Sequence, residues 1–251
     1  AATLKDTDFS EITEVQVKAG ITAIGSGAFL DQKTIKKVSL PDSVLTIETN
    51  AFRGCETLEE IQFGSALKTI GSFAFYRCKS LASLALPDSV KTLETGAFQE
   101  CTALKTAALG NGVKKLPIQL FRGCTSLETV ELSSSLEVIG EQSFCLCSAL
   151  KNIVIPSGVY RIDKNAFSGC SALNLNLPED LEDQGDGSYR KRGGLKISGT
   201  YLYSEAEKVL TLVNQERGKL GLEPVEMDRE LLEGAMIRSA ELNVLYSEQR
   251  P

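Results

Sequence analysis

The sequence predicts an α/β solenoid, in which stacked repeats each contribute one short parallel strand and a small helical segment follows at the C-terminus. Three observations lead to this prediction. Phenylalanine recurs every 23 residues, six of the seven cysteines keep the same interval, and the apolar pattern changes after Pro178. Such an interval indicates stacking, because a unit this small cannot bury its apolar face alone.

The phenylalanines and cysteines set the register of the repeat. They lie at Phe29, Phe52, Phe75, Phe98, Phe121, Phe144 and Phe167, and at Cys55, Cys78, Cys101, Cys124, Cys147 and Cys170. Phenylalanine and cysteine three residues apart are expected on the buried side of one turn of a short helical segment. We expect these cysteines to fill core volume as reduced, slowly reacting thiols. Disulfides are the alternative, disfavoured because their geometry is demanding.

Each repeat also predicts one strand. Ile61 and Phe63 alternate with Glu60 and Gln62, so the apolar pair faces inward and the polar pair faces outward. Proline or glycine follows directly and ends the strand. Two further apolar columns, which begin at Val44 and Ile47, complete the unit, and no strand is assigned to them.

The L-x-x-V-x-L strand pattern and the I-G-x-x-A-F-x-x-C segment, as in residues 70–78, resemble the BspA-type leucine-rich repeat. The resemblance covers about residues 12–178 and implies a secreted or surface-displayed protein that functions in adhesion or protein binding. A half repeat at Ile12, Val15 and Val17 is expected to cap the N-terminal end. The last strand, near Leu173, is expected to be irregular because its repeat is one residue short.

The composition changes after the array, which we assign to residues 1–178. Residues 179–203 are rich in charge and glycine and predict a linker, whose basic run at 190–192 reads as solvated charge or a protease-sensitive site. A helical period over 204–251 predicts two helices. Residues 213–217 and 221–224 resemble the start of a CAP domain, the cysteine-rich secretory and pathogenesis-related superfamily. Glu248 stands where that family has a histidine, so a truncated domain without its cavity is expected.

Composition limits the chemistry. The chain has no histidine, which removes the commonest general base and metal ligand, and we expect no catalytic residue, metal or cofactor. A net charge of −6, without a basic cluster, argues against nucleic acid. The chain has no run of 18 apolar residues, so membrane insertion is not expected. Cys145, outside the cysteine column, is the one candidate reactive thiol.

The leading hypothesis is therefore a non-enzymatic, secreted or cell-surface module that binds a protein on a host or another cell. A rigid spacer that presents a CAP-like effector domain is the alternative, and an enzyme that acts through that segment is a third, disfavoured hypothesis. The outward strand positions, on a side expected to be concave, are the candidate binding residues. They are Lys37, Glu60, Gln62, Ser83, Ala85, Thr106, Ala108, Thr129, Glu131, Asn152 and Val154. Arg53, Tyr76, Arg77 and Arg122, on the opposite side, are the second candidate set.

Overall fold

The computed structural model of the chain describes residues 11–191 together with Asn214, Gln215 and Lys219. Residues 11–191 form a β-solenoid of about six turns with parallel strands, which confirms the predicted leucine-rich-repeat solenoid. The two predicted helices and the CAP-like segment otherwise lie outside the described residues. Among the described residues, no helix is long and apolar enough to cross a membrane.

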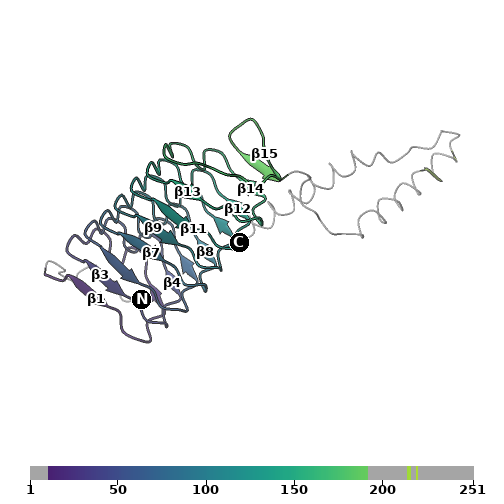
Figure 1. Ribbon diagram of the computed structural model, residues 1–251. Coiled ribbons are helices and arrows are strands. Elements are labelled where there is room, and N and C mark those ends of the chain that lie inside the picture. The colour runs from purple at the N-terminus through teal and green to yellow at the C-terminus, as the bar shows by residue number, and fades with distance from the viewer. Residues whose placement is uncertain (1–10, 192–213, 216–218, 220–251) are drawn as a thin grey trace. The chain divides into compact units, whose positions relative to one another are not determined.

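Two rows of short strands run along the stack (Figure 1). The first ladder contains β1 (Glu14–Gln16), β3 (Lys37–Ser39), β5 (Glu60–Gln62), β7 (Ser83–Ala85), β9 (Thr106–Ala108), β11 (Thr129–Glu131) and β13 (Asn152–Ile153). The second ladder contains β2 (Ala23–Ile24), β4 (Thr46–Ile47), β6 (Thr69–Ile70), β8 (Thr92–Leu93), β10 (Lys115–Leu116), β12 (Val138–Ile139) and β14 (Arg161–Ile162). Within each ladder the paired residues are one repeat apart, as in Lys37↔Glu60 and Thr46↔Thr69.

The prediction of one strand per repeat is therefore wrong, because each complete repeat has two. The second ladder grows from the column that begins at Ile47, whose strands are two residues long. A strand of two residues is too short to show the alternation of inward and outward side chains. Its sequence therefore does not identify it as a strand. These short strands pair nonetheless, because stacking places equivalent residues of neighbouring repeats side by side.

The segment between phenylalanine and cysteine is a run of tight turns and not the expected helical turn. The amides of Arg53 and Cys55 donate to carbonyls three residues back, both at 3.1 Å. The amides of Phe52 and Gly54, which alternate with them along the chain, donate to the next repeat, both at 2.7 Å. Asn50 and Gly54 adopt left-handed conformations with φ of 58° and 73°, which interrupts helical geometry. Because every second amide donates to the neighbouring repeat, the segment cannot form the consecutive hydrogen bonds of a helix.

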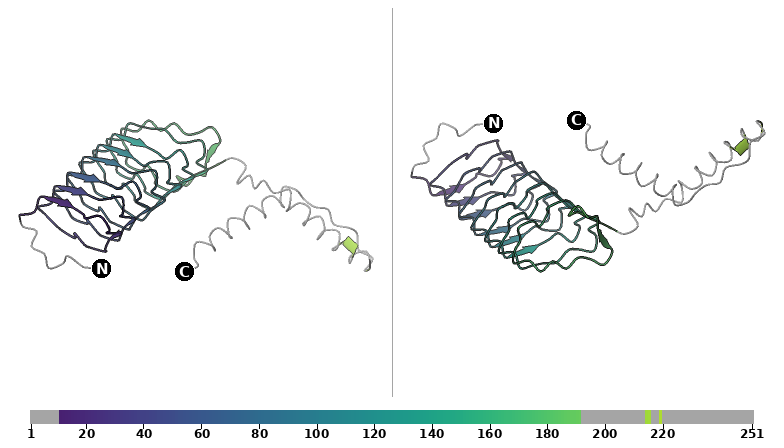
Figure 2. Two further views of the ribbon diagram at one scale, coloured as in Figure 1. Left: turned by 90° about the horizontal axis from the view of Figure 1, so that it is seen from below. Right: turned by 90° about the horizontal axis from the view of Figure 1, so that it is seen from above.

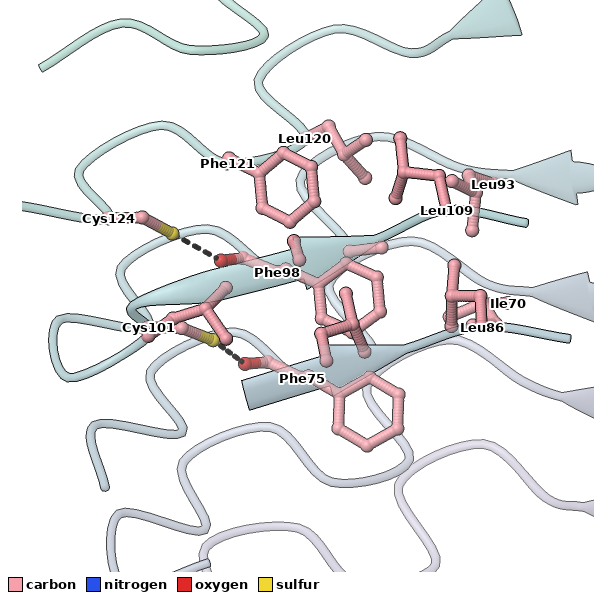
Figure 3. Close-up of a cluster of buried hydrophobic side chains, with 14 of the residues drawn as sticks. Ile70, Phe75, Leu86, Leu93, Phe98, Cys101, Leu109, Leu120, Phe121 and Cys124 are labelled. Carbon is pink, nitrogen blue, oxygen red and sulfur yellow. Dashed lines mark hydrogen bonds between the residues drawn. The ribbon is translucent and has the colours of Figure 1, made fainter. Parts of the chain in front are cut away.

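The core is a continuous stack of phenylalanine rings (Figure 3). Successive rings from Phe29 to Phe167 lie nearly parallel with centroids 4.9 to 5.7 Å apart. Beside them, the thiol of Cys101 donates to the carbonyl of Phe75, and that of Cys124 to Phe98, both at 3.2 Å. All seven thiols are free, and the column cysteines from 55 to 147 are buried. The expected core position of this column is therefore confirmed, with Cys170 at its partly exposed end.

Each ladder has one interruption within the described array. The first ladder divides between β5 and β7, and the second divides between β8 and β10. In the other repeats, the residue after the second strand donates its amide to the previous repeat, as Gly140 does to Leu116 at 3.0 Å. Pro117 holds that position after β10 and has no amide hydrogen. The missing donor explains why the second ladder breaks at this repeat.

The C-terminal end of the array is closed by a hairpin. β15 (Leu181–Asp183) pairs with β16 (Tyr189–Lys191), and β16 pairs antiparallel with β14. The linker prediction is therefore wrong for residues 181–191, although residues 192–203 lie outside the described residues. Gly185 and Gly187, with φ of 76° and 80°, form the hairpin turn and not a flexible link. The basic run is partly used by the fold, because Lys191 pairs with Asp180 at 2.8 Å.

Candidate protein-binding surface

The structure brings the eleven predicted binding residues together on the outward side of the first ladder. All are exposed except Ala108, which is half-buried. Ser83, Thr106 and Thr129 lie beside one another in register, and Ala85 and Ala108 form the parallel column. Lys37, Glu60 and Gln62 lie on the three-stranded part, beyond the interruption of the ladder. We call this set the first-ladder face; Figure 2 shows its strands lined up along the stack.

Charges at both ends of the first-ladder face are paired across the register. Lys37 Nζ lies 3.7 Å from Glu60 Oε2, and Lys36 Nζ lies 3.5 Å from Glu59 Oε1. Near the other end, Lys151 Nζ lies 3.0 Å from Glu128 Oε2. Between these pairs the outward side chains on β7 and β9 and at Thr129 are small, and Glu131 lies in register with Ala108 at the edge of this strip. The arrangement offers a flat central strip flanked by neutralised charge pairs, which suits a protein surface better than a small molecule.

A hollow that the sequence pattern did not reveal continues this face at its C-terminal end. It has a volume of about 320 Å³ and lies between the end of β13 and the irregular last repeat. Val154 beside it is 82% exposed, the largest exposed fraction among the large hydrophobic residues of the array. The lining residues are Asn152, Ile153, Val154, Ile155, Asn174, Asn176, Leu177 and Pro178. The one-residue deletion before Leu175 was the only sequence signal for it.

The second ladder carries a smaller hollow of about 250 Å³, which sequence reasoning also missed. Its walls include Glu48 and Glu94, and Gly71 between them has no side chain to fill the space. Both carboxylates are used by the fold. Glu48 accepts the amide of Ser26 at 2.8 Å, and Glu94 accepts the amide and the hydroxyl of Ser72 at 2.9 Å. These contacts assign the two acids to turn stabilisation.

The cysteine column is poorly suited to nucleophilic chemistry. Burial raises the pKa of the Cys55 thiol to about 12 and that of Cys170 to about 11. Burial likewise holds the pKa of Cys78 and Cys124 well above the ordinary value. Because the thiolate is the reactive form, these residues remain unreactive near neutral pH. Across the part of the chain that the structure describes, no group of three histidine, cysteine, aspartate or glutamate residues is arranged to hold a metal ion.

Comparison with known families gives one match. The model of the BspA type leucine rich repeat region matches in six copies, over residues 7–128 and 68–196. The matches end before residue 213, where the CAP-like resemblance begins, and none of the comparisons supports a CAP domain. A search of curated proteins found no match.

Several solved structures are similar to the array. A leucine rich cell surface protein from Faecalibacterium prausnitzii A2-165 is 32% identical with a TM-score of 0.61, over 69% of this chain and 50% of that one. A leucine-rich repeat protein from Bacteroides ovatus ATCC 8483 is 28% identical with a TM-score of 0.62, over 68% and 44%. The T. pallidum leucine rich repeat protein is 28% identical with a TM-score of 0.59, over 66% and 78%. The chain thus spans half or less of the first two proteins.

Proposed function

Because the chain belongs to the BspA-type leucine-rich repeat family, we propose that it is a non-catalytic module, secreted or displayed on a cell surface, that binds a protein through the first-ladder face. The observation that carries this proposal is the continuous register of outward side chains on β7, β9 and β11, which are small except for Glu131. Members of this family are often surface-associated protein-binding modules. The similar F. prausnitzii protein is described as a cell surface protein, which supports the proposed location.

The rigidity of the face favours binding over a purely passive role. β9 and β11 are paired on both sides and β7 is paired with β9, and their inward residues Leu84, Ala107 and Val130 are buried. Little conformational entropy is therefore lost when a partner covers the strip. The hollow beside Val154 adds an apolar contact at one end. Binding energy is expected to concentrate there, because the central strip lacks the large side chains typical of binding hot spots.

The proposal is tested with a double variant, Ala85→Arg with Ala108→Arg. Both residues lie in the outward column, so two long charged side chains would fill the strip and leave the core untouched. A library of displayed extracellular protein domains is first selected for binding to the wild-type chain. Each selected domain is then measured by surface plasmon resonance against wild type and variant. We expect the variant to weaken binding at least tenfold, because the bulk of two arginine side chains would keep a partner away from the strip.

A matched control places the same two arginines on the second ladder, at Thr46→Arg with Thr92→Arg. This control changes the net charge equally and is expected to bind the selected domains as wild type does. Thermal melts of both variants verify that the fold is retained. If the selected domains bind the Ala85/Ala108 variant as tightly as the control, the first-ladder face is not the binding surface. If selection yields no domain above background, the protein-binding proposal itself fails.

A further inference from the structure

A basic and aromatic cluster lies on the opposite side of the array, on the face formed by the turns between phenylalanine and cysteine. We call it the turn-face cluster, and it consists of Arg53, Tyr76, Arg77, Glu100 and Arg122, from four consecutive repeats. The ring of Tyr76 contacts two guanidinium groups, with Arg53 Cζ at 5.5 Å and Arg77 Cζ at 5.1 Å from its centroid. Such cation–π contacts hold long side chains in place.

Glu100 locks the centre of the turn-face cluster. One carboxylate oxygen accepts Arg77 Nε at 2.7 Å, and the other accepts the hydroxyl of Tyr76 at 3.2 Å. Both oxygens are thus engaged, and the side chains of Tyr76 and Arg77 are fixed relative to each other. A preorganised surface loses less entropy on binding than free arginines would.

The turn-face cluster has more positive charge than its own acid neutralises. The cluster holds three guanidinium groups and one carboxylate, in a chain whose net charge is −6. Arg53 contacts the ring of Tyr76 but has no ion pair within the described array. Arg122 Nε is buried and lacks a hydrogen-bond partner among the described residues, as does Oε1 of the adjacent Gln99. Elsewhere in the array, lysine and glutamate pair across neighbouring repeats, as Lys114 and Glu137 do at 2.9 Å.

We propose that the turn-face cluster binds an extended acidic segment of a partner protein, with carboxylates seated on Arg53 and Arg122. Guanidinium groups bind carboxylates through paired hydrogen bonds, and arginine and tyrosine are enriched at the centres of protein interfaces. The two arginines are three repeats apart. The adjacent phenylalanine rings place each repeat 5.1 to 5.7 Å from the next. At about 3.3 Å per extended residue, acidic residues about five positions apart would reach both arginines.

Three fluorescein-labelled Ser/Thr peptides test this spacing. Each carries two glutamate pairs, separated by two, five or nine positions, so that composition and charge are identical. Fluorescence anisotropy at low salt is expected to show at least fivefold tighter binding of the peptide with the five-residue separation. The double variant Arg53→Ala with Arg122→Ala is expected to bind that peptide at least tenfold more weakly.

A control removes the same charge from another face, by Lys68→Ala with Lys91→Ala. Both lysines are exposed and directly precede the second-ladder strands β6 and β8, and we expect less than a twofold effect. Circular dichroism melts verify that each variant is folded. Equal affinity for all three peptides, or equal losses in the lysine and arginine variants, would overturn the proposal and indicate general attraction of anions. Displacement of the peptide by a sulfated polysaccharide, with no dependence on Arg53 and Arg122, would overturn it as well.

Discussion

At the scale of single residues, the repeating cysteine has a task that volume alone does not explain. Each column thiol donates to the carbonyl of a phenylalanine in the preceding repeat, at 2.9 to 3.2 Å. Alanine would fit the space but leave that carbonyl with one partner fewer. The cysteine therefore adds a weak, directional bond between repeats in a position that is otherwise apolar.

Thiol labelling tests the environment of these residues. In the native protein at pH 8, we expect one rapidly reacting thiol, Cys145, which is only partly buried. The column thiols should react slowly, because burial suppresses their thiolate forms. An Ellman's assay in denaturant should then count all seven thiols, and Cys145→Ser should abolish the fast phase. A denatured count below seven would show disulfides and contradict the structure.

Stability at high pH provides a second test at this scale. Burial raises the pKa of Cys55 from 9.0 to about 12 in the folded protein. Between these values the unfolded chain releases a proton that the folded chain retains, so the free energy of unfolding falls as pH rises. One such thiol contributes a slope of up to about 1.4 kcal/mol per pH unit, and nothing below pH 9. Urea unfolding from pH 8 to 11 should give a shallower decline for Cys55→Ala.

Phe98→Leu serves as the control for that experiment, since it weakens the core without removing a titrating group and should keep the wild-type slope. A Cys55→Ala slope equal to that of wild type would mean that Cys55 is not shielded from solvent.

The phenylalanine stack allows a direct test of packing. Phe98 is fully buried, with neighbouring ring centroids at 5.2 and 5.7 Å. Phe98→Ala removes the ring from the middle of the stack and should cost about 3–5 kcal/mol of unfolding free energy. Phe98→Leu should cost less because it leaves a smaller cavity. Urea denaturation measures both, and an alanine variant that unfolds together with the wild type would contradict the core position of Phe98.

At the scale of elements, the sequence predicts those strands in which inward and outward side chains alternate in every repeat. The strand around Ile61 was predicted because two inward residues alternate with two outward ones. The strand at Thr46 was not, because two residues carry no alternation and pair only when stacked. The hairpin at residues 181–191 was mistaken for a linker, because its charge and glycine content are also typical of linkers. The hollow beside Val154 depends on how the chain accommodates one missing residue, which local patterns do not specify.

The hairpin is expected to stabilise the last repeats. The amide of Lys191 donates to the carbonyl of Tyr160 at 2.9 Å, which joins β16 to β14. Lys191→Pro removes this donor and places a ring in the strand. Hydrogen exchange should accelerate in residues 161–163 and remain unchanged in the central repeats, because contacts in such arrays are made between neighbours. Lys191→Ala loses the side-chain contacts with Asp180 and the carbonyl of Ser157 but keeps the backbone amide, and it should exchange nearly as wild type does. Uniform acceleration along the array would instead show that the hairpin does not act locally on the last repeats.

At the scale of the whole molecule, the described array is a chain of equivalent interfaces, interrupted once in each ladder at different heights. Because the breaks do not coincide, the repeats that lack pairing in one ladder remain paired in the other. The phenylalanine stack also continues through both positions. The array should therefore unfold as one cooperative unit, although each ladder alone is divided.

Deletion of a whole repeat tests this architecture. Removing residues 76–98 joins Phe75 to Gln99 and restores the phenylalanine-to-cysteine spacing, with Cys101 three residues after Phe75. Both ladders and the ring stack can then close in register, so we expect a folded, shorter solenoid. The slope of its unfolding free energy against urea concentration should decrease in proportion to the buried surface removed. Removing residues 76–86 instead deletes β7 and shortens one repeat by 11 residues, so no shift restores both sets of strands. That variant should fail to fold by circular dichroism, and equal folding of the two deletions would disprove the fixed 23-residue register.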